Sequence, residues 1–247
     1  MSSTSPFSSI ARHRYIQRPP IATYISSRFR SANLADGLDA DGPSIGAVWG
    51  NQHDGRSRTD RIRYDSPKFQ GFMFSASHIQ GDLWDVALRH AGKFGQFKTS
   101  AAIAYVDWEQ VSASSGSGGT KGEQVDGSFS VLHDSGLNVT FSGGTRDNDG
   151  LDISGASRNS DDHIYVMLGY IAKLFDVGTT RFAVDYGQAN DINQNDDEIT
   201  TWGIAVNQNL KNIGTDLYVV YRNHEMDRTG ESFDDINIVM AGARVKF

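Results

Sequence analysis

The chain has 247 residues, a formal net charge of -7 and no cysteine, which excludes a disulfide scaffold, a Cys-based zinc site and a thiol catalyst. Residues 1–35 carry only basic charges, so the rest is acidic, which argues against nucleic acid as the main partner. The longest near-apolar stretch, Val166 to Ala172, has the length of a strand, whereas a membrane helix needs about 18 apolar residues. A helical membrane protein is excluded, but a membrane β-barrel is not, because barrel strands alternate apolar and polar residues.

Apolar and polar residues alternate strictly in several windows, including 137–142, 181–186 and 201–207. Such alternation predicts strands with one apolar face. All prolines lie before residue 68, and continuous sheet excludes proline except at edges and bulges. The predicted strands cover residues 44–50, 58–66, 69–78, 82–91, 96–108, 123–132, 136–146, 162–173, 178–189, 197–209, 213–223 and 234–247.

The predicted connections alternate in length. Short ones lie near 66–68, 92–95, 133–135, 175–177 and 210–212, longer ones near 51–57, 109–122, 147–161, 190–196 and 223–233, and the link at 79–81 is a short exception. Short turns at one end and long loops at the other are typical of outer-membrane barrels. Many of these strands have about the 9–11 residues that a tilted strand needs to cross a bilayer. We therefore predict an all-β protein, a transmembrane antiparallel β-barrel.

The charged residues of these strands share the polar face. In a membrane barrel this face lines water and the apolar face meets lipid, whereas in a soluble sheet the charges would face solvent. Aromatic residues near strand ends, such as Trp84, Tyr105 and Trp202, fit interfacial girdles or, alternatively, a sandwich core. The predicted pore-lining residues are Arg61, Arg63, Asp65, Asp85, Arg89, Lys98, Arg181, Asp185, Arg222 and Arg244.

Three segments resemble the Gram-negative general porins. The run from Asp60 to Phe72 is similar to their RIRYDSP-x-F-x-G-F segment, and Trp84 to Arg89 resembles the strand that follows it. The last strand ends in Val245 and Phe247, which resembles the porin assembly signal. The resemblance implies a trimeric, water-filled outer-membrane barrel of about 16 strands that passes small hydrophilic solutes. An inward-folded loop narrows such pores, and Asp36, Asp39 and Asp41 are the candidates for it here.

The sequence departs from that family in two respects. It predicts about twelve strands, and residues 1–35 lack the apolar core and cleavage site of a signal peptide. We interpret residues 43–247 as the barrel region of a porin that lacks its N-terminal strands. Residues 1–42 are then an irregular or misread start that includes a candidate remnant of the constriction loop. The Arg- and Ser-rich composition of residues 1–35, which contain no acidic residue, is also typical of a transit peptide.

No motif in the sequence indicates an enzyme, a cofactor or a metal ion. The acidic groups around Asp152 and Asp197 fit soluble external loops or, alternatively, sites where divalent cations bridge to lipopolysaccharide. The expected partners are outer-membrane lipid, lipopolysaccharide, two further copies in a homotrimer and the outer-membrane assembly machinery, but not nucleic acid. A surface adhesin without conductance and a soluble lectin-like sandwich remain alternatives, and a rim-based outer-membrane enzyme is a further one.

Overall fold

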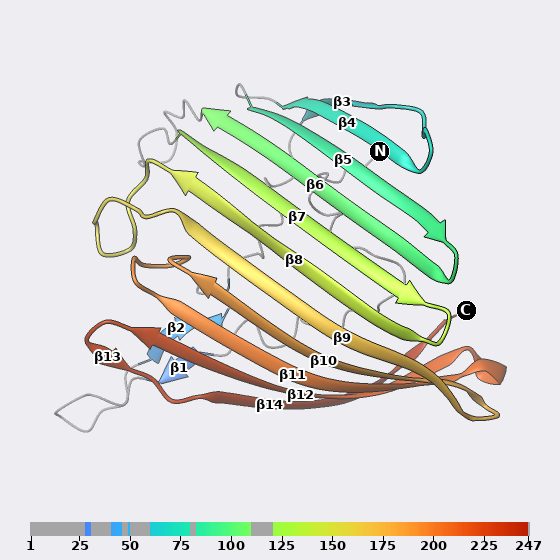
Figure 1. The fold of residues 1–247 in the computed structure, drawn as a ribbon. Helices are drawn as coiled ribbons and strands as arrows, with labels where there is room; N and C mark the ends of the chain where they lie inside the picture. The colour runs from blue at the N-terminus through green and yellow to red at the C-terminus, as the bar shows by residue number, and fades with distance from the viewer. Residues whose placement is uncertain are drawn as a thin grey trace.

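The computed structural model describes residues 28–30, 41–45, 49, 60–79, 83–109 and 121–246. These residues form a two-stranded sheet and a strongly curved twelve-stranded antiparallel sheet (Figure 1). Its elements are β1 (Arg28–Arg30), β2 (Asp41–Ser44), β3 (Arg61–Asp65), β4 (Phe72–Ile79), β5 (Leu83–Phe94), β6 (Phe97–Glu109), β7 (Lys121–His133), β8 (Leu137–Asn148), β9 (Asp161–Phe175), β10 (Gly178–Asn190), β11 (Glu198–Leu210), the 3-10 turn η2 (Lys211–Ile213), β12 (Thr215–Arg228), β13 (Glu231–Ser232) and β14 (Ile236–Val245). This architecture confirms the predicted all-β fold class.

Strand order in the large sheet follows the sequence. Each strand from β3 to β12 pairs antiparallel with the next, and β14 pairs with β12. Among the described strands, β3 pairs only with β4 and β14 only with β12, so the sheet is not closed. From β5 onward the long strands have between 10 and 15 residues. That length covers the hydrocarbon core of a bilayer when the strand is tilted.

The predicted alternation of connections is confirmed where the chain is described. Short turns at 66–71, 95–96, 134–136, 176–177 and 211–214 gather at one end, on the right in Figure 1. Long connections at 149–160 and 191–197, and the segment 229–235 that includes β13, join the strands at the other end, whereas residues 110–120 lie outside the described residues. We call these the short-turn end and the long-loop end. Residues 80–82, which carry the predicted short exception, and the predicted loop at 51–57 lie outside the described residues.

Three strand predictions need correction. The predicted strand 44–50 is wrong, because β2 ends at Ser44 and the Trp49 amide donates to the Ile45 carbonyl oxygen at 2.9 Å, as in a helical turn. The predicted strand 69–78 starts too early. Gln70 and Gly71 take left-handed φ values of 47° and 87°, which extends the turn to Gly71. The strand predicted at 213–223 continues to Arg228, and the short strand β13 lies inside the loop predicted at 223–233. The remaining predicted strands are confirmed to within a few residues.

Burial defines the two faces of the curved sheet. On β5, Leu83, Asp85 and Ala87 are buried, whereas Trp84 and Leu88 are exposed. We call the face that carries Leu83, Asp85 and Ala87 the inner face, and the face that carries Trp84 and Leu88 the outer face. Residues paired across neighbouring strands point to the same side of the sheet, so the pairing assigns the faces of the other strands. The described chain has no helix that is both long and apolar enough to span a membrane.

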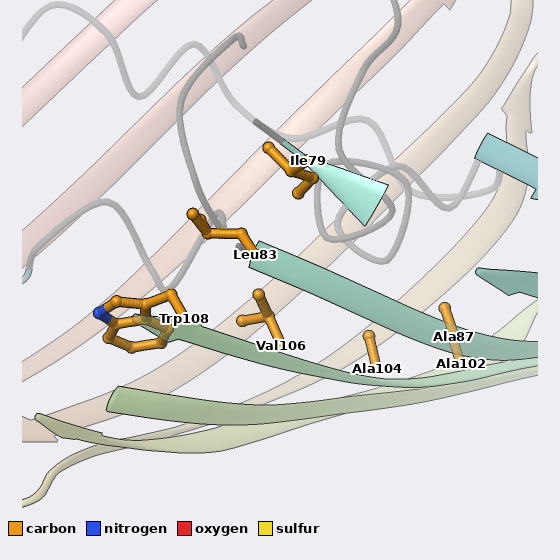
Figure 2. Close-up of a cluster of buried hydrophobic side chains, with 7 residues drawn as sticks. All are labelled: Ile79, Leu83, Ala87, Ala102, Ala104, Val106 and Trp108. Atoms are coloured by element: carbon orange, nitrogen blue, oxygen red, sulfur yellow. The ribbon is translucent and has the colours of Figure 1, made fainter. Parts of the chain in front are cut away.

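Apolar side chains gather on the inner face in two places near the long-loop end. The first cluster lies on β4, β5 and β6 (Figure 2) and consists of Ile79, Leu83, Ala87, Ala102, Ala104, Val106 and Trp108. The second lies on β10 to β12 and their loops and consists of Ala189, Ile192, Ile199 and Met226, with Phe233, Ile236 and Ile238 beside it. Ile45 and Trp49 pack into the second cluster, so these two residues are held against the inner face.

Candidate channel lining

The distribution of polarity between the two faces is the reverse of that in a soluble protein. Large apolar side chains of the outer face are exposed, among them Ile103 at 54% and Leu168 at 47%. Charged and polar side chains of the inner face are buried, among them Asp85, Asp185 and Arg222. In water this arrangement would leave a wide apolar surface unburied, but in a bilayer the apolar face meets lipid.

Aromatic side chains border the outer face at both ends. Near the long-loop end, Trp84 lies against Tyr105 and Trp202 against Tyr221, each pair with tilted rings and centroids 5.2 Å apart. The Tyr105 hydroxyl donates to Glu123 and the Tyr221 hydroxyl to Asn237. At the short-turn end, Phe72 lies 4.4 Å from His90 and Phe97 lies 4.9 Å from His133, centroid to centroid. Rings with a polar partner at the rim of an apolar band are typical of the membrane interface.

All ten predicted pore-lining residues lie on the inner face. This shared face follows from the two-residue period of the strands. The structure groups nine of them into three charged clusters, and Lys98 lies apart from these clusters near the short-turn end of β6. Their function as pore lining stays a prediction.

The first cluster joins β3, β4 and β5. Arg61 forms an ion pair with Asp85 at 3.3 Å, and both side chains are buried. Arg63 pairs with Asp65 at 2.8 Å in a more exposed position. Hydroxyl groups from β4 complete the network, because Ser77 donates to Asp85, and Ser75 both donates to Asp65 and accepts from Arg89 at 2.6 Å. Arginines therefore outnumber carboxylates in this cluster.

The second cluster is a buried ion pair between β10 and β12. Arg222 lies 2.8 Å from Asp185, with side-chain exposures of 8% and 5%. Gly203 of the intervening strand β11 faces both side chains in register. The absence of a side chain at Gly203 lets the pair form directly across β11.

The third cluster surrounds Asp216 near the short-turn end. Lys246 lies 2.5 Å, Arg244 3.5 Å and Arg181 3.7 Å from its carboxylate, which is itself buried. Asn209 donates to the same carboxylate at 2.8 Å. One buried carboxylate thus binds three partly exposed cations at the short-turn end of the sheet.

The sequence analysis missed several charged residues of the inner face. Asp161 of β9 is fully buried and accepts from Arg146 at 2.6 and 2.9 Å, while Arg158 lies 3.5 Å away. Asp126 of β7 lies 4.0 Å from His163 of β9. The alternation of polar and apolar residues could have revealed them. Asp126, Arg146 and Asp161 each lie an even number of positions from polar residues of the same strand and therefore on the polar face.

The other predicted site residues are placed only in part. Asp36, Asp39 and Phe247 lie outside the described residues, and Asp41 begins β2. Val245 ends β14 on the outer face, opposite Thr215. The constriction-loop and assembly roles stay predictions, as does the domain division at residue 42.

The loops at the long-loop end are bound to one another through carboxylates. Asp152 in loop 149–160 accepts from the Ser154 and Ala156 amides within its loop, and from the Asn195 amide of loop 191–197 at 3.1 Å. The Ser154 hydroxyl and these amides hold the pKa of Asp152 down at about 2. Asp197 receives two hydrogen bonds from Arg228 at 2.6 and 2.8 Å. The carboxylates of Asp152 and Asp197 are therefore used in hydrogen bonds that hold the loops together.

A metal site in this rim was one sequence-based alternative. Within the described ranges, no group of three or more His, Asp or Glu side chains is arranged to hold a metal ion. The bridging of lipopolysaccharide through divalent cations stays a prediction.

Comparison with known proteins agrees with this geometry. The family model described as Gram-negative porin matches residues 25–229, and the chain therefore belongs to the Gram-negative porin family. Membership places it in the outer membrane and supports a channel protein. No curated protein sequence matches the chain.

Solved structures show the same fold. An anion-selective porin from Comamonas acidovorans has a TM-score of 0.56 at 16% identity, over 85% of this chain and 68% of that one. OccK9 (OpdG) of Pseudomonas aeruginosa has a TM-score of 0.53 at 11% identity, over 76% of this chain and 56% of that one. OmpT of Vibrio cholerae has a TM-score of 0.50 at 11% identity, over 86% of this chain and 71% of that one. At these identities the likeness concerns the fold alone, and the matched part spans between 56% and 71% of those proteins.

Proposed function

We propose that this protein lines a water-filled pore that passes small hydrophilic solutes and ions passively across the outer membrane. The observation that carries the proposal is the inverted polarity of the sheet, with charged side chains on the inner face and large apolar ones on the outer face. Charged side chains are costly to hold away from water, so a face that carries many of them fits an aqueous channel. The exposed apolar face also argues against the soluble sandwich.

The charges of the inner face favour anions. Its cations include Arg61, Arg63, Arg89, Lys93, Lys98, Arg146, Arg181, Arg222, Arg228, Arg244 and Lys246, against the carboxylates Asp65, Asp85, Asp126, Asp161, Asp185 and Asp216. Lys98 forms no salt bridge with any residue that the structure describes. Rings of charge in a pore bias which ions pass. A modest anion preference follows, and one structural neighbour bears the name of an anion-selective porin.

The segment after β2 is the described candidate for narrowing the pore. Ile45 is buried in the second apolar cluster of the inner face, and the partly buried Trp49 packs against that cluster. Their anchorage holds these two residues inside the curve of the sheet, where a constricting element would reduce the cross-section. This supports the assignment of Asp41, and of the adjoining Asp36 and Asp39, to a constriction segment.

Single-channel recording tests the proposal. The 247-residue chain, refolded in detergent, is added to a planar lipid bilayer, and the reversal potential is measured in a salt gradient. We expect discrete conductance steps and a reversal potential on the anion side. Protein that inserts and shows sheet by circular dichroism, yet never conducts, would contradict the pore.

The partners belong to the same proposal. We expect a homotrimer embedded in lipid, with lipopolysaccharide at the long-loop end and assembly through the outer-membrane machinery. Chemical cross-linking of the refolded protein in native-like membranes measures the oligomer. A monomer at all protein concentrations would contradict the trimer without touching the pore.

A further inference from the structure

Glycines on the inner face share an unusual environment. Glycine in the middle of a strand weakens the sheet, so its presence needs a local reason, and a close approach by another group is one such reason. On this wall the approaching group is a large side chain from another segment. The glycines concerned are Gly122, Gly144, Gly169, Gly187, Gly203 and Gly242.

The overlap is tightest at Gly144, where a Cβ atom would lie 2.1 Å from Asp126 Oδ1, and it is nearly as tight at three further positions. A Cβ atom at Gly242 would lie 2.3 Å from the Tyr218 hydroxyl oxygen, and one at Gly169 would lie 2.4 Å from Asn138 Oδ1. A Cβ at Gly122 would lie 2.3 Å from Trp108 Cζ2. Each distance is far inside van der Waals contact, so the large side chain occupies the place where a neighbouring side chain would begin.

Register explains why the contacts recur. Tyr218 is the direct pairing partner of Gly242, Asn138 that of Gly169, and Trp108 that of Gly122. Asp126 stands in the same relation to Gly144, and Arg222 to Gly203. A side chain on a strand normally stands perpendicular to the sheet. Opposite a glycine it leans onto the neighbouring strand and lies along the wall.

The strand glycines of the outer face that the structure describes lack this arrangement. A Cβ at Gly127 would meet nothing closer than the Ala102 carbonyl oxygen at 3.7 Å, and at Gly143 no side-chain atom comes closer than 3.7 Å. The side chain nearest to Gly92 is His90, which belongs to the same strand. Lipid does not require side chains to lie flat, whereas a pore loses cross-section to every side chain that stands upright.

We propose that the inner-wall glycines determine the bore of the channel by letting bulky side chains of the paired strand lie flat on the wall. The inference rests on the proposed pore function and adds the residues that determine its width. A methyl group at such a glycine displaces the overlying side chain, and the direction left open to it is toward the lumen. The glycines are then positioning residues, and the overlying side chains are the groups that limit solute size.

Gly242→Ala and Gly169→Ala are the cleanest tests, because the three nearest atoms at each site all belong to the overlying side chain. Gly127→Ala on the outer face is the matched control. We expect a loss of single-channel conductance in both inner-wall variants, larger for Gly242→Ala because Tyr218 is the bulkier side chain, and wild-type conductance in the control. An equal loss in the control would overturn the proposal.

A double-mutant cycle isolates the contact. Without the Tyr218 ring there is nothing to displace, so Gly242→Ala should cost no conductance in a Tyr218→Ala background. The same loss in both backgrounds would show that Gly242 acts through the backbone and would overturn the proposal. Should Gly242→Ala not fold, recovery of folding in the double variant reports the same contact, and failure of both to fold refutes it.

A readout without conductance separates this proposal from the pore itself. Nitration of Tyr218 by tetranitromethane, followed by peptide mass spectrometry, reports how accessible the phenol ring is. We expect faster nitration of Tyr218 in Gly242→Ala than in the wild type, and no change in Gly127→Ala. If the wild type does not conduct, the pore proposal fails, but unchanged nitration would still be needed to refute the leaning of Tyr218.

Discussion

The inner face has two charged regions, one on β3–β5 and one on β10–β14, which arrange arginines and aspartates differently. In the β3–β5 region, the Ser75 hydroxyl links Arg89 to Asp65, and the Arg63–Asp65 pair is partly exposed beside the buried Arg61–Asp85 pair. In the β10–β14 region, Arg222 contacts Asp185 directly across a glycine, and both are buried. Removing the charge of Arg222 is therefore expected to destabilise the fold more than removing that of Arg63, because the buried Asp185 has no water to replace its partner.

Arg222→Met should give the largest effect. It leaves Asp185 buried without its cation, and breaking such a pair costs about 3–5 kcal/mol. Urea unfolding of the refolded protein measures the loss of unfolding free energy. Arg63→Met is the matched control in the other region. Equal free energies of unfolding for the two variants would refute the difference between the regions.

Asp216→Asn comes next. The buried carboxylate holds Arg181, Arg244 and Lys246, but these cations are between 33% and 50% exposed, so water compensates part of the loss. We expect a loss of about 2 kcal/mol in unfolding free energy. The reversal potential should shift further toward anions, because three cations lose their shared counterion. A shift toward cations would contradict the placement of this cluster on the pore wall.

Arg63→Met should change stability by less than about 1 kcal/mol, since exposed ion pairs contribute little. Its effect is expected in selectivity, where loss of one inner-face cation moves the reversal potential toward cations. Ile62→Met, on the outer face of the same strand, is the control and should leave the potential unchanged. Identical potentials for the two variants would place Arg63 off the ion path.

The smallest effect concerns the loops and depends on pH. The pKa of Asp152 lies at about 2, below its ordinary value of 3.8, so its carboxylate stabilises the folded loop fully above pH 3.8. That stabilisation is lost as the pH falls through about 2. Amide chemical shifts of Ser154, Ala156 and Asn195 should stay constant above about pH 4 and move at lower pH. Asp152→Asn should remove the titration, and an unchanged titration in that variant would assign it to another group.

Much of the fold was predictable because it is encoded in local alternation. The polar parity of β10 and β12 is enough to place Arg181, Asp185 and Arg222 on one face. The strand predicted at 44–50 failed for a tertiary reason. Ile45 and Trp49 pack into an apolar cluster of distant strands, and a helical turn presents both side chains to it.

Which side chains share a face can be read along the chain alone, since successive residues of any strand point to opposite sides. Which side chains meet depends on how the strands are placed against one another. Asp185 reaches Arg222 and Tyr218 lies over Gly242 because turns and pairing fix the register of strands, and a shift by one residue would separate both pairs. Alternation is a property of one strand, whereas register is a property of two.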